Sequence, residues 1–164
     1  MSRAWTFGDD LDTDQILPGR YAPFMTGQDT FHTYAFHDAR PEFAGTVRPG
    51  DVVVGGENFG CGSSREYAVA ALKVLGVGGV VAKSFARIFF RNCVNLGIPV
   101  LESGEACSLV SDGDDVTLDL AAGRLVTPRG AAALRPLPPF AQEILSAGGV
   151  VAYLRAHGYF PEIA

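Results

Sequence analysis

The feature that most constrains the fold is a short apolar run that leads into a glycine-rich loop and then into a helical pattern. The run Val52-Val53-Val54 follows the turn residues Pro49-Gly50-Asp51, and four glycines lie between positions 55 and 62. A continuous apolar run between turn residues is typical of a buried strand. Residues 63–75 then predict a helix that ends at Gly76. A strand, a glycine loop and a helix in this order form a ligand-binding arrangement.

The alternation of apolar runs and helical stretches extends over much of the chain. Residues 5–8 predict a first strand, residues 80–82 a later strand, residues 85–96 a helix that ends at Gly97, and residues 98–101 a further strand. Two successive strand–helix–strand units require right-handed crossovers and a partly parallel sheet. The fold class that we expect is therefore α/β, with a mixed, partly parallel sheet and flanking helices.

Two other regions have their own patterns. Residues 28–39 carry several aromatic side chains after an irregular stretch and predict a short helix. Toward the C-terminus, residues 116–120 and 124–127 predict a β-hairpin. Helical periodicity resumes at residues 140–145 and breaks at Gly148-Gly149 before a last helical stretch.

Length and composition limit the classes of function. The 164 residues suit one domain over positions 1–164, and a hydrophobic content of 48% is that of a folded chain. A net charge of −5 with dispersed cations argues against nucleic-acid binding. The apolar runs are far shorter than the roughly 20 residues that span a bilayer, and the N-terminus lacks the apolar core of a signal peptide. We expect a cytoplasmic protein.

The three cysteines do not indicate a metal site. Cys61, Cys93 and Cys107 are odd in number and widely spaced, so they form neither a disulfide framework nor a Cys-x-x-Cys pair. We expect small buried or loop thiols at these positions. Any metal would have to be held by another chain.

The sequence Ser63-Ser64-Arg65-Glu66 follows the glycine loop and has two interpretations. As a capping box, Ser63 accepts from the third helical amide while Glu66 reaches back to the cap. As an anion site, the glycines let backbone amides approach a ligand at the positive end of the helix. Arg65 opposes the helix dipole there, which indicates another task, such as bidentate binding of a carboxylate. A serine beside a guanidinium and amide dipoles can act as a base, since both stabilise the alkoxide.

Two other ligand classes fit the loops less well. A nucleotide-phosphate loop requires Lys after its last glycine, whereas Ser63 follows Gly62 here. The acid-rich run at 9–14 resembles a calcium loop at first, but the sixth and twelfth positions hold Asp14 and Arg20 instead of Gly and Glu. The carboxylate interpretation therefore stands ahead of both.

Three motifs together carry a family resemblance. They are Asp12-Thr13-Asp14-Gln15-Ile16-Leu17-Pro18-Gly19, Asn58-Phe59-Gly60-Cys61-Gly62-Ser63-Ser64-Arg65-Glu66 and Ser84-Phe85-Ala86-Arg87-Ile88-Phe89-Phe90-Arg91-Asn92. In this order they resemble the small subunits of aconitase-type hydro-lyases, which correspond to the mobile fourth domain of aconitase. The resemblance covers essentially the whole chain. One departure is Tyr67, where most of the family has a His, so a family role for a protonated His is in doubt.

The resemblance implies a swivelling β/β/α domain that docks on a large subunit. That subunit would hold a [4Fe-4S] cluster with its own cysteines. Ser63 would be the base that takes the carbon-bound proton, Ser64 its hydrogen-bonding neighbour, and Asp14 the acidic catalytic residue of this half. Asp14 also has the alternative interpretation of a turn-capping aspartate. The residues implied in substrate binding are Arg65 as the carboxylate clamp, Thr13, Arg20 and Tyr21.

The loop after Pro18-Gly19 bears on the substrate, because in the resemblance it lines the pocket for the variable group. Homocitrate would present a carboxylate arm to this loop and isopropylmalate an isopropyl group, so Arg20 favours homoaconitase over 3-isopropylmalate dehydratase. Both are hydro-lyases that dehydrate and rehydrate a 2-hydroxy polycarboxylic acid. The alternative from another class is a stand-alone small-anion-binding or regulatory module built on the same glycine loop.

Overall fold

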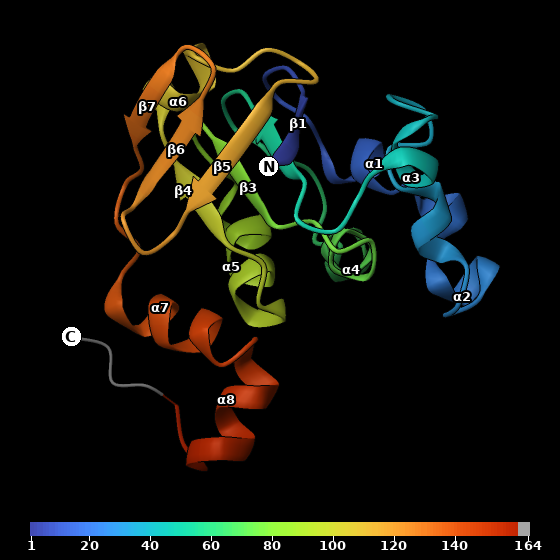
Figure 1. Ribbon diagram of the computed structural model, residues 1–164. Coiled ribbons are helices and arrows are strands. Elements are labelled where there is room, and N and C mark those ends of the chain that lie inside the picture. Colours follow the sequence, from blue (N-terminus) through green and yellow to red (C-terminus); the bar gives the residue numbers. More distant parts are fainter. Residues whose placement is uncertain (161–164) are drawn as a thin grey trace.

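The computed structural model describes residues 1–160 and has a seven-stranded mixed sheet at its centre (Figure 1). The strand order is β4-β3-β2-β1-β5-β6-β7. The strands are β1 (Ser2–Thr6), β2 (Val52–Gly55), β3 (Gly79–Ala82), β4 (Val100–Glu102), β5 (Asp115–Asp119), β6 (Arg124–Thr127) and β7 (Gly130–Ala133). The expected mixed α/β sheet is confirmed.

The first four strands form the parallel half of the sheet. β1 pairs with β2, β2 with β3, and β3 with β4, all in parallel. β2 and β3 are buried at every position, which is why they appear as unbroken apolar runs in the sequence. The predicted strands at 5–8 and 98–101 exist but are displaced, since β1 ends at Thr6 and β4 begins at Val100.

The other half of the sheet is antiparallel. β5 pairs with β1 through Ser2↔Val116, and β6 and β7 follow in turn. The predicted hairpin of β5 and β6 is confirmed. β7 was not predicted, because Gly-Ala-Ala-Ala has little strand propensity. It is held by its pairing with β6 across a tight turn, in which Thr127 lies opposite Gly130.

Helices cover both faces of the sheet unequally (Figure 1). One face carries α4 (Glu66–Val74), α5 (Arg87–Leu96), α7 (Pro139–Ser146) and α8 (Val150–His157), which pack over Val53 and Val80. The other face packs Val52, Val54 and Val81 against α6 (Gly104–Ser108) and the antiparallel strands. The predicted α5 ends as expected at Gly97, which adopts φ 80°, although it begins at Arg87 instead of Phe85. The two predicted C-terminal helices are confirmed.

The segment between β1 and β2 consists of short helical turns. They are α1 (Thr13–Ile16), η1 (Gly19–Tyr21), α2 (Pro23–Thr26), η2 (Phe31–Tyr34) and α3 (Phe43–Thr46). The predicted helix over 28–39 is therefore wrong except for the single turn η2. The helical turn cannot continue through Phe36, because the Phe36 backbone adopts φ 54° and its N–H donates to the Ile16 carbonyl at 2.7 Å. A tertiary contact has replaced the next helical hydrogen bond.

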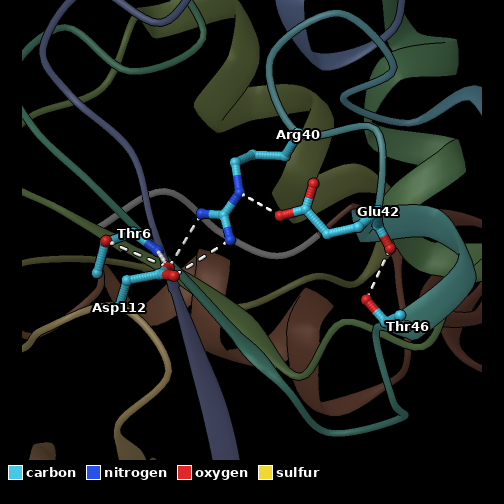
Figure 2. Close-up of polar contacts among 5 residues, drawn as sticks. All are labelled: Thr6, Arg40, Glu42, Thr46 and Asp112. Carbon is cyan, nitrogen blue, oxygen red and sulfur yellow. Dashed lines mark hydrogen bonds and ion pairs between the residues drawn. The ribbon is translucent and has the colours of Figure 1, made fainter.

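An ion-pair network ties this segment to the sheet (Figure 2). The Arg40 guanidinium donates to both carboxylate oxygens of Asp112, at 3.0 and 3.1 Å, and to Glu42 at 2.7 Å. Asp112 also accepts from the backbone N–H of Thr6 at 2.9 Å. Partial burial alone would raise the pKa of Asp112, but the bonds from Arg40 and Thr6 prevail and hold this pKa below its usual range.

Along residues 1–160, no helix has the length and apolar character that crossing a bilayer requires.

Candidate active site

The three sequence motifs meet at one edge of the sheet. β1, β2 and β3 are adjacent and parallel, so the loops that follow them leave from the same edge. Backbone bonds join the first two loops, since Gly60 N–H donates to the Leu11 carbonyl at 2.7 Å and Thr13 N–H to the Cys61 carbonyl at 2.9 Å. The third loop is joined to the second, because Phe59 N–H donates to the Ser84 carbonyl at 3.0 Å.

Two residues of the glycine loop, Asn58 and Gly60, adopt backbone conformations with positive φ and are fixed by contacts with other loops and with α5. Asn58 adopts φ 53°, its N–H donates to Ser84 Oγ at 2.8 Å, and its side chain donates to Asp10 at 2.8 Å. Gly60 adopts φ 78°, and a Cβ there would lie 2.1 Å from Cγ of the buried Phe89. Glycine is therefore required both by the backbone conformation and by the close packing of the helix beneath it. The loop was predicted from the family motif. Its hydrogen bonds to Ser84 were not, because Ser84 is 26 positions away from Asn58.

The predicted capping box at Ser63 is wrong. α4 begins at Glu66, with Arg65 at the N-cap position in a non-helical conformation (φ −130°, ψ 88°) and no side-chain cap. Asp12 and Cys61 form a parallel bridge and Thr13 Oγ1 donates to the Ser63 carbonyl at 2.9 Å, and these contacts hold the segment before Arg65 outside the helix. The Ser63 hydroxyl is therefore not used by the helix.

A capping box does occur, at a different helix. Asp12 is the N-cap of α1, where its carboxylate accepts from Gln15 N–H at 2.8 Å. The Gln15 side chain accepts in return from Asp12 N–H at 3.0 Å. This reciprocal pair fixes the first turn of α1, which carries Asp14 toward the glycine loop.

Arg65 is the centre of the site. Its Nε donates to Ser63 Oγ at 2.8 Å, and its Nη1 donates to the Asp14 carboxylate and lies 3.5 Å from the Leu17 carbonyl. A Cβ on Gly19 would lie 3.4 Å from Nη1, which is an ordinary contact distance, so Gly19 packs directly against the guanidinium. Within residues 1–160, Nη2 has no protein hydrogen-bond partner. The guanidinium is thus held through Nε and Nη1, while Nη2 is unpaired in the described residues.

Asp14 makes the contact expected of a turn-capping aspartate. Its carboxylate accepts from the Gly19 N–H at 2.9 Å and also from Arg65. The bond from Gly19 and then that from Arg65 lower the pKa of Asp14, so the group is a carboxylate at neutral pH. Its side chain remains 57% exposed. The role of acidic catalytic residue stays a prediction.

The two serines and Thr13 have different surroundings. Ser63 and Ser64 are both exposed, and the partner of the Ser63 hydroxyl within residues 1–160 is Arg65 and not Ser64. Thr13 is buried, and its hydroxyl holds the Ser63 carbonyl. The structure therefore places Thr13 behind the site, where it positions Ser63, instead of on the open surface.

The loop after Gly19, which we expect to line the substrate pocket, is held by contacts between its own side chains and neighbouring residues. Arg20 donates to both carboxylate oxygens of Asp38, at 2.6 and 2.7 Å, and its guanidinium lies 4.7 Å from the Tyr21 ring centroid. Tyr21 stacks in turn on Tyr34 at 4.1 Å. Asp38 was missed in the sequence because it is 18 positions away and belongs to no motif. The cation that pointed to a carboxylate arm is thus already paired.

An apolar surface lies beside this loop. Phe24 is 79% exposed, and its ring meets the edge of Tyr67 at 6.3 Å. Tyr67 is half-buried one residue beyond Glu66, so it joins the loop to the start of α4. The position where most of the family has His therefore holds an aromatic contact.

The three cysteines differ in burial, with Cys93 buried and the other two half-buried. Burial raises the pKa of the Cys61 thiol, with Asp12 and Asp10 adding to the effect. Burial likewise raises the pKa of Cys93, and that of Cys107 to about 11. Across the described residues 1–160, no three His, Cys, Asp or Glu side chains converge to hold a metal ion.

Fold and site together define an α/β domain with a polar site at the carboxyl edge of its parallel strands. Residues 13–105 match the family described as the aconitase C-terminal domain. The chain belongs to this family. The expected resemblance is thereby confirmed.

Individual relatives agree with this membership. The homoaconitase small subunit of Thermus thermophilus is 58% identical, over 98% of this chain and 99% of the relative. The 3-isopropylmalate dehydratase small subunit 1 of Deinococcus radiodurans is 54% identical, over 98% of this chain and 90% of the relative. A crystal structure of 3-isopropylmalate dehydratase from Methanocaldococcus jannaschii matches with a TM-score of 0.89 at 41% identity, covering 96% of this chain and 93% of that one. Both kinds of relative are hydro-lyases.

Proposed function

We propose that this chain is the small subunit of a heteromeric hydro-lyase, in which it forms a single swivelling domain over positions 1–164. The observation that carries the proposal is the assembly of Ser63, Arg65 and Asp14 on an exposed loop edge, in a chain of the aconitase C-terminal domain family. The partner is a large subunit, as the names of the relatives indicate. The cytoplasm is the compartment that we propose for the assembled enzyme.

The reaction is the reversible dehydration of a 2-hydroxy polycarboxylic acid. We assign Ser63 as the base that takes the carbon-bound proton, while the hydroxyl on the adjacent carbon departs and an alkene forms. The bond that Arg65 Nε donates to the Ser63 oxygen supports this role, because it stabilises the alkoxide more than the alcohol. In the reverse direction, the protonated Ser63 returns the proton to carbon.

Arg65 has a second task in the proposal. Its Nη1 is taken up by Asp14, and its Nη2, unpaired within residues 1–160, can donate to a substrate carboxylate. Asp14 fixes the guanidinium and partly neutralises it, which limits the penalty of burying the cation when the site closes. Ser64 is the exposed neighbour that can donate to substrate or to Ser63.

The departing hydroxyl requires chemistry that these residues do not supply. A [4Fe-4S] cluster, which hydro-lyases of this family generally use, would act there as a Lewis acid, and we place it on the large subunit.

Two substrates are favoured by different observations. Homocitrate is favoured by Arg20 and by the 58% identity to a homoaconitase small subunit. In that case the carboxylate arm competes with Asp38 for Arg20, and the enzyme serves lysine biosynthesis. Isopropylmalate is favoured by the pairing of Arg20 with Asp38 and by the exposed Phe24 ring, which suits an isopropyl group. In that case the enzyme serves leucine biosynthesis. We propose homocitrate, and isopropylmalate is the second candidate.

The test is reconstitution with the large subunit encoded in the same genome. The purified pair, with its cluster intact, is assayed for the unsaturated acid formed from homocitrate and from isopropylmalate. We expect turnover of homocitrate by the pair and none by this chain alone. A higher kcat/KM for isopropylmalate would select the second candidate. Failure of the two chains to associate would support the stand-alone module instead. Turnover by the chain alone would contradict the need for a large subunit.

A further inference from the structure

A cavity of about 630 Å³ lies between α5, β4 and the segment before α7. Its volume lies in the range of roughly 300 to 1,000 Å³ that is usual for small-molecule sites. None of the residues assigned above to the proposed reaction lines it. The residues that do are drawn from residues 85–91, from β4 and from residues 135–138.

One wall of the cavity is cationic. Arg87 and Arg91 are four residues apart on α5, so they lie on the same face of the helix, and both are exposed. Within residues 1–160, neither forms a salt bridge with a carboxylate. A third cation, Arg135, is already paired with Glu102 at 2.9 Å. The wall therefore has two cations available to an anion.

Arg87 is also placed where a cation is unfavourable. It occupies the first position of α5, whose N-cap Ala86 offers no side-chain cap. The positive end of the helix dipole and the guanidinium then act on the same space, and both favour an anion there. The helix end alone would not indicate a site, but here it adds to two unpaired guanidinium groups in one cavity.

The lining also contains apolar side chains. Phe85 and Phe90 contribute rings whose centroids are 6.2 Å apart, Val100 is fully buried, and Leu137 lies between two prolines. A phosphate or a small polycarboxylate would leave these apolar side chains without a contact. A hydrocarbon group of about four to six carbons would cover them, and the burial of apolar surface favours binding.

We propose that this cavity binds a small organic carboxylate with a branched or aromatic hydrocarbon end. The carboxylate lies against Arg87 and Arg91, and the hydrocarbon lies on Phe85, Phe90 and Leu137. Its lining residues differ from those of the proposed substrate site, since neither Arg65 nor Ser63 lines the cavity.

The test measures binding to the full 164-residue chain by amide chemical-shift titration. The probes are 4-methylpentanoate and 3-phenylpropanoate. Two matched controls remove one half of the ligand each: 4-methylpentanamide lacks the charge, and succinate lacks the hydrocarbon end. We expect saturable shifts at residues 85–91 and 135–138 with the two probes, and at least about tenfold weaker binding of both controls.

Variants locate the site. Arg87→Gln and Arg91→Gln should each weaken probe binding about tenfold, while Arg155→Gln, an exposed arginine on α8, should leave it unchanged. Arg65→Gln should also leave it unchanged, which separates this cavity from the substrate site. Unchanged spectra away from the substituted residue show that each variant is folded.

Three outcomes would overturn the proposal. Shifts confined to residues 60–66 would mean that the probes bind the substrate site. Equal binding of the probe and its amide would mean that no cation is involved. No binding by the free chain, together with weaker association of Arg87→Gln or Arg91→Gln with the large subunit, would mean that the cavity is a protein interface.

Discussion

Replacing Ser63 with Ala tests whether the hydroxyl works in chemistry or in structure. The helix begins three residues later, so the variant loses no cap, and the single bond lost is that from Arg65 Nε at 2.8 Å on an exposed loop. A surface change of this kind usually stays within about 0.5 kcal/mol of the wild-type free energy of unfolding. Asp12→Ala is the matched comparison, because it removes a true cap.

The magnitude for Asp12 follows from its capping box. The substitution breaks the bond from Gln15 N–H at 2.8 Å and leaves that amide without its cap. Loss of an N-cap costs about 1 kcal/mol, which for a domain of this size lowers the melting temperature by roughly 2 to 4 °C. Thermal unfolding of the two purified variants should therefore rank Asp12→Ala below Ser63→Ala.

Activity should rank differently. In the reconstituted enzyme, loss of a positioned base removes about 10²-fold or more in kcat, while Arg65 keeps its bond to Asp14 and so KM should change little. If Ser63→Ala kept more than about a tenth of kcat, the hydroxyl would not be the base. A raised KM with normal kcat would show that Ser63 only orients Arg65. Equal destabilisation of the two variants would contradict the assignment of the caps.

Three other changes give sharp expectations. Asp14→Asn should raise KM about tenfold by loosening Arg65. Because the folded pKa of Asp14 is lowered from 3.8, its contribution to stability is present above that pH and is lost as the pH falls through the folded value. Urea unfolding of the variant should therefore show less loss of stability below about pH 4 than the wild type. Arg20→Leu should cost homocitrate about 1.5 to 3 kcal/mol of transition-state binding relative to isopropylmalate, measured as the change in the ratio of their kcat/KM values. An unchanged ratio would assign the selectivity to other residues. Gly60→Ala should lose about 1 to 2 kcal/mol from its positive φ and about 1 to 3 from crowding on Phe89. Gly104→Ala, where a Cβ meets nothing within 4 Å, should remain near wild-type stability in the same denaturant titration.

The sequence predicted those features that depend on neighbouring residues. The buried strands β2 and β3 appear as apolar runs, and the glycines after α4 and α5 mark where those helices end. The location of the site was also predictable, because each motif directly follows a strand and parallel neighbours end at one edge. These inferences need only periodicity and turn chemistry, both of which act over a few residues.

Contacts between distant residues decided the rest. Ser63 has the sequence of a cap, yet Thr13, 50 positions away, holds its carbonyl outside the helix. Arg20 suggests an available cation, yet Asp38 pairs with it. Phe36 lies in a helical pattern, yet it bonds to Ile16. In each case a tertiary contact outweighed what the neighbouring sequence favours. The sequence by itself therefore predicted which residues belong to the proposed site, and the tertiary structure determined which protein partners their side chains have.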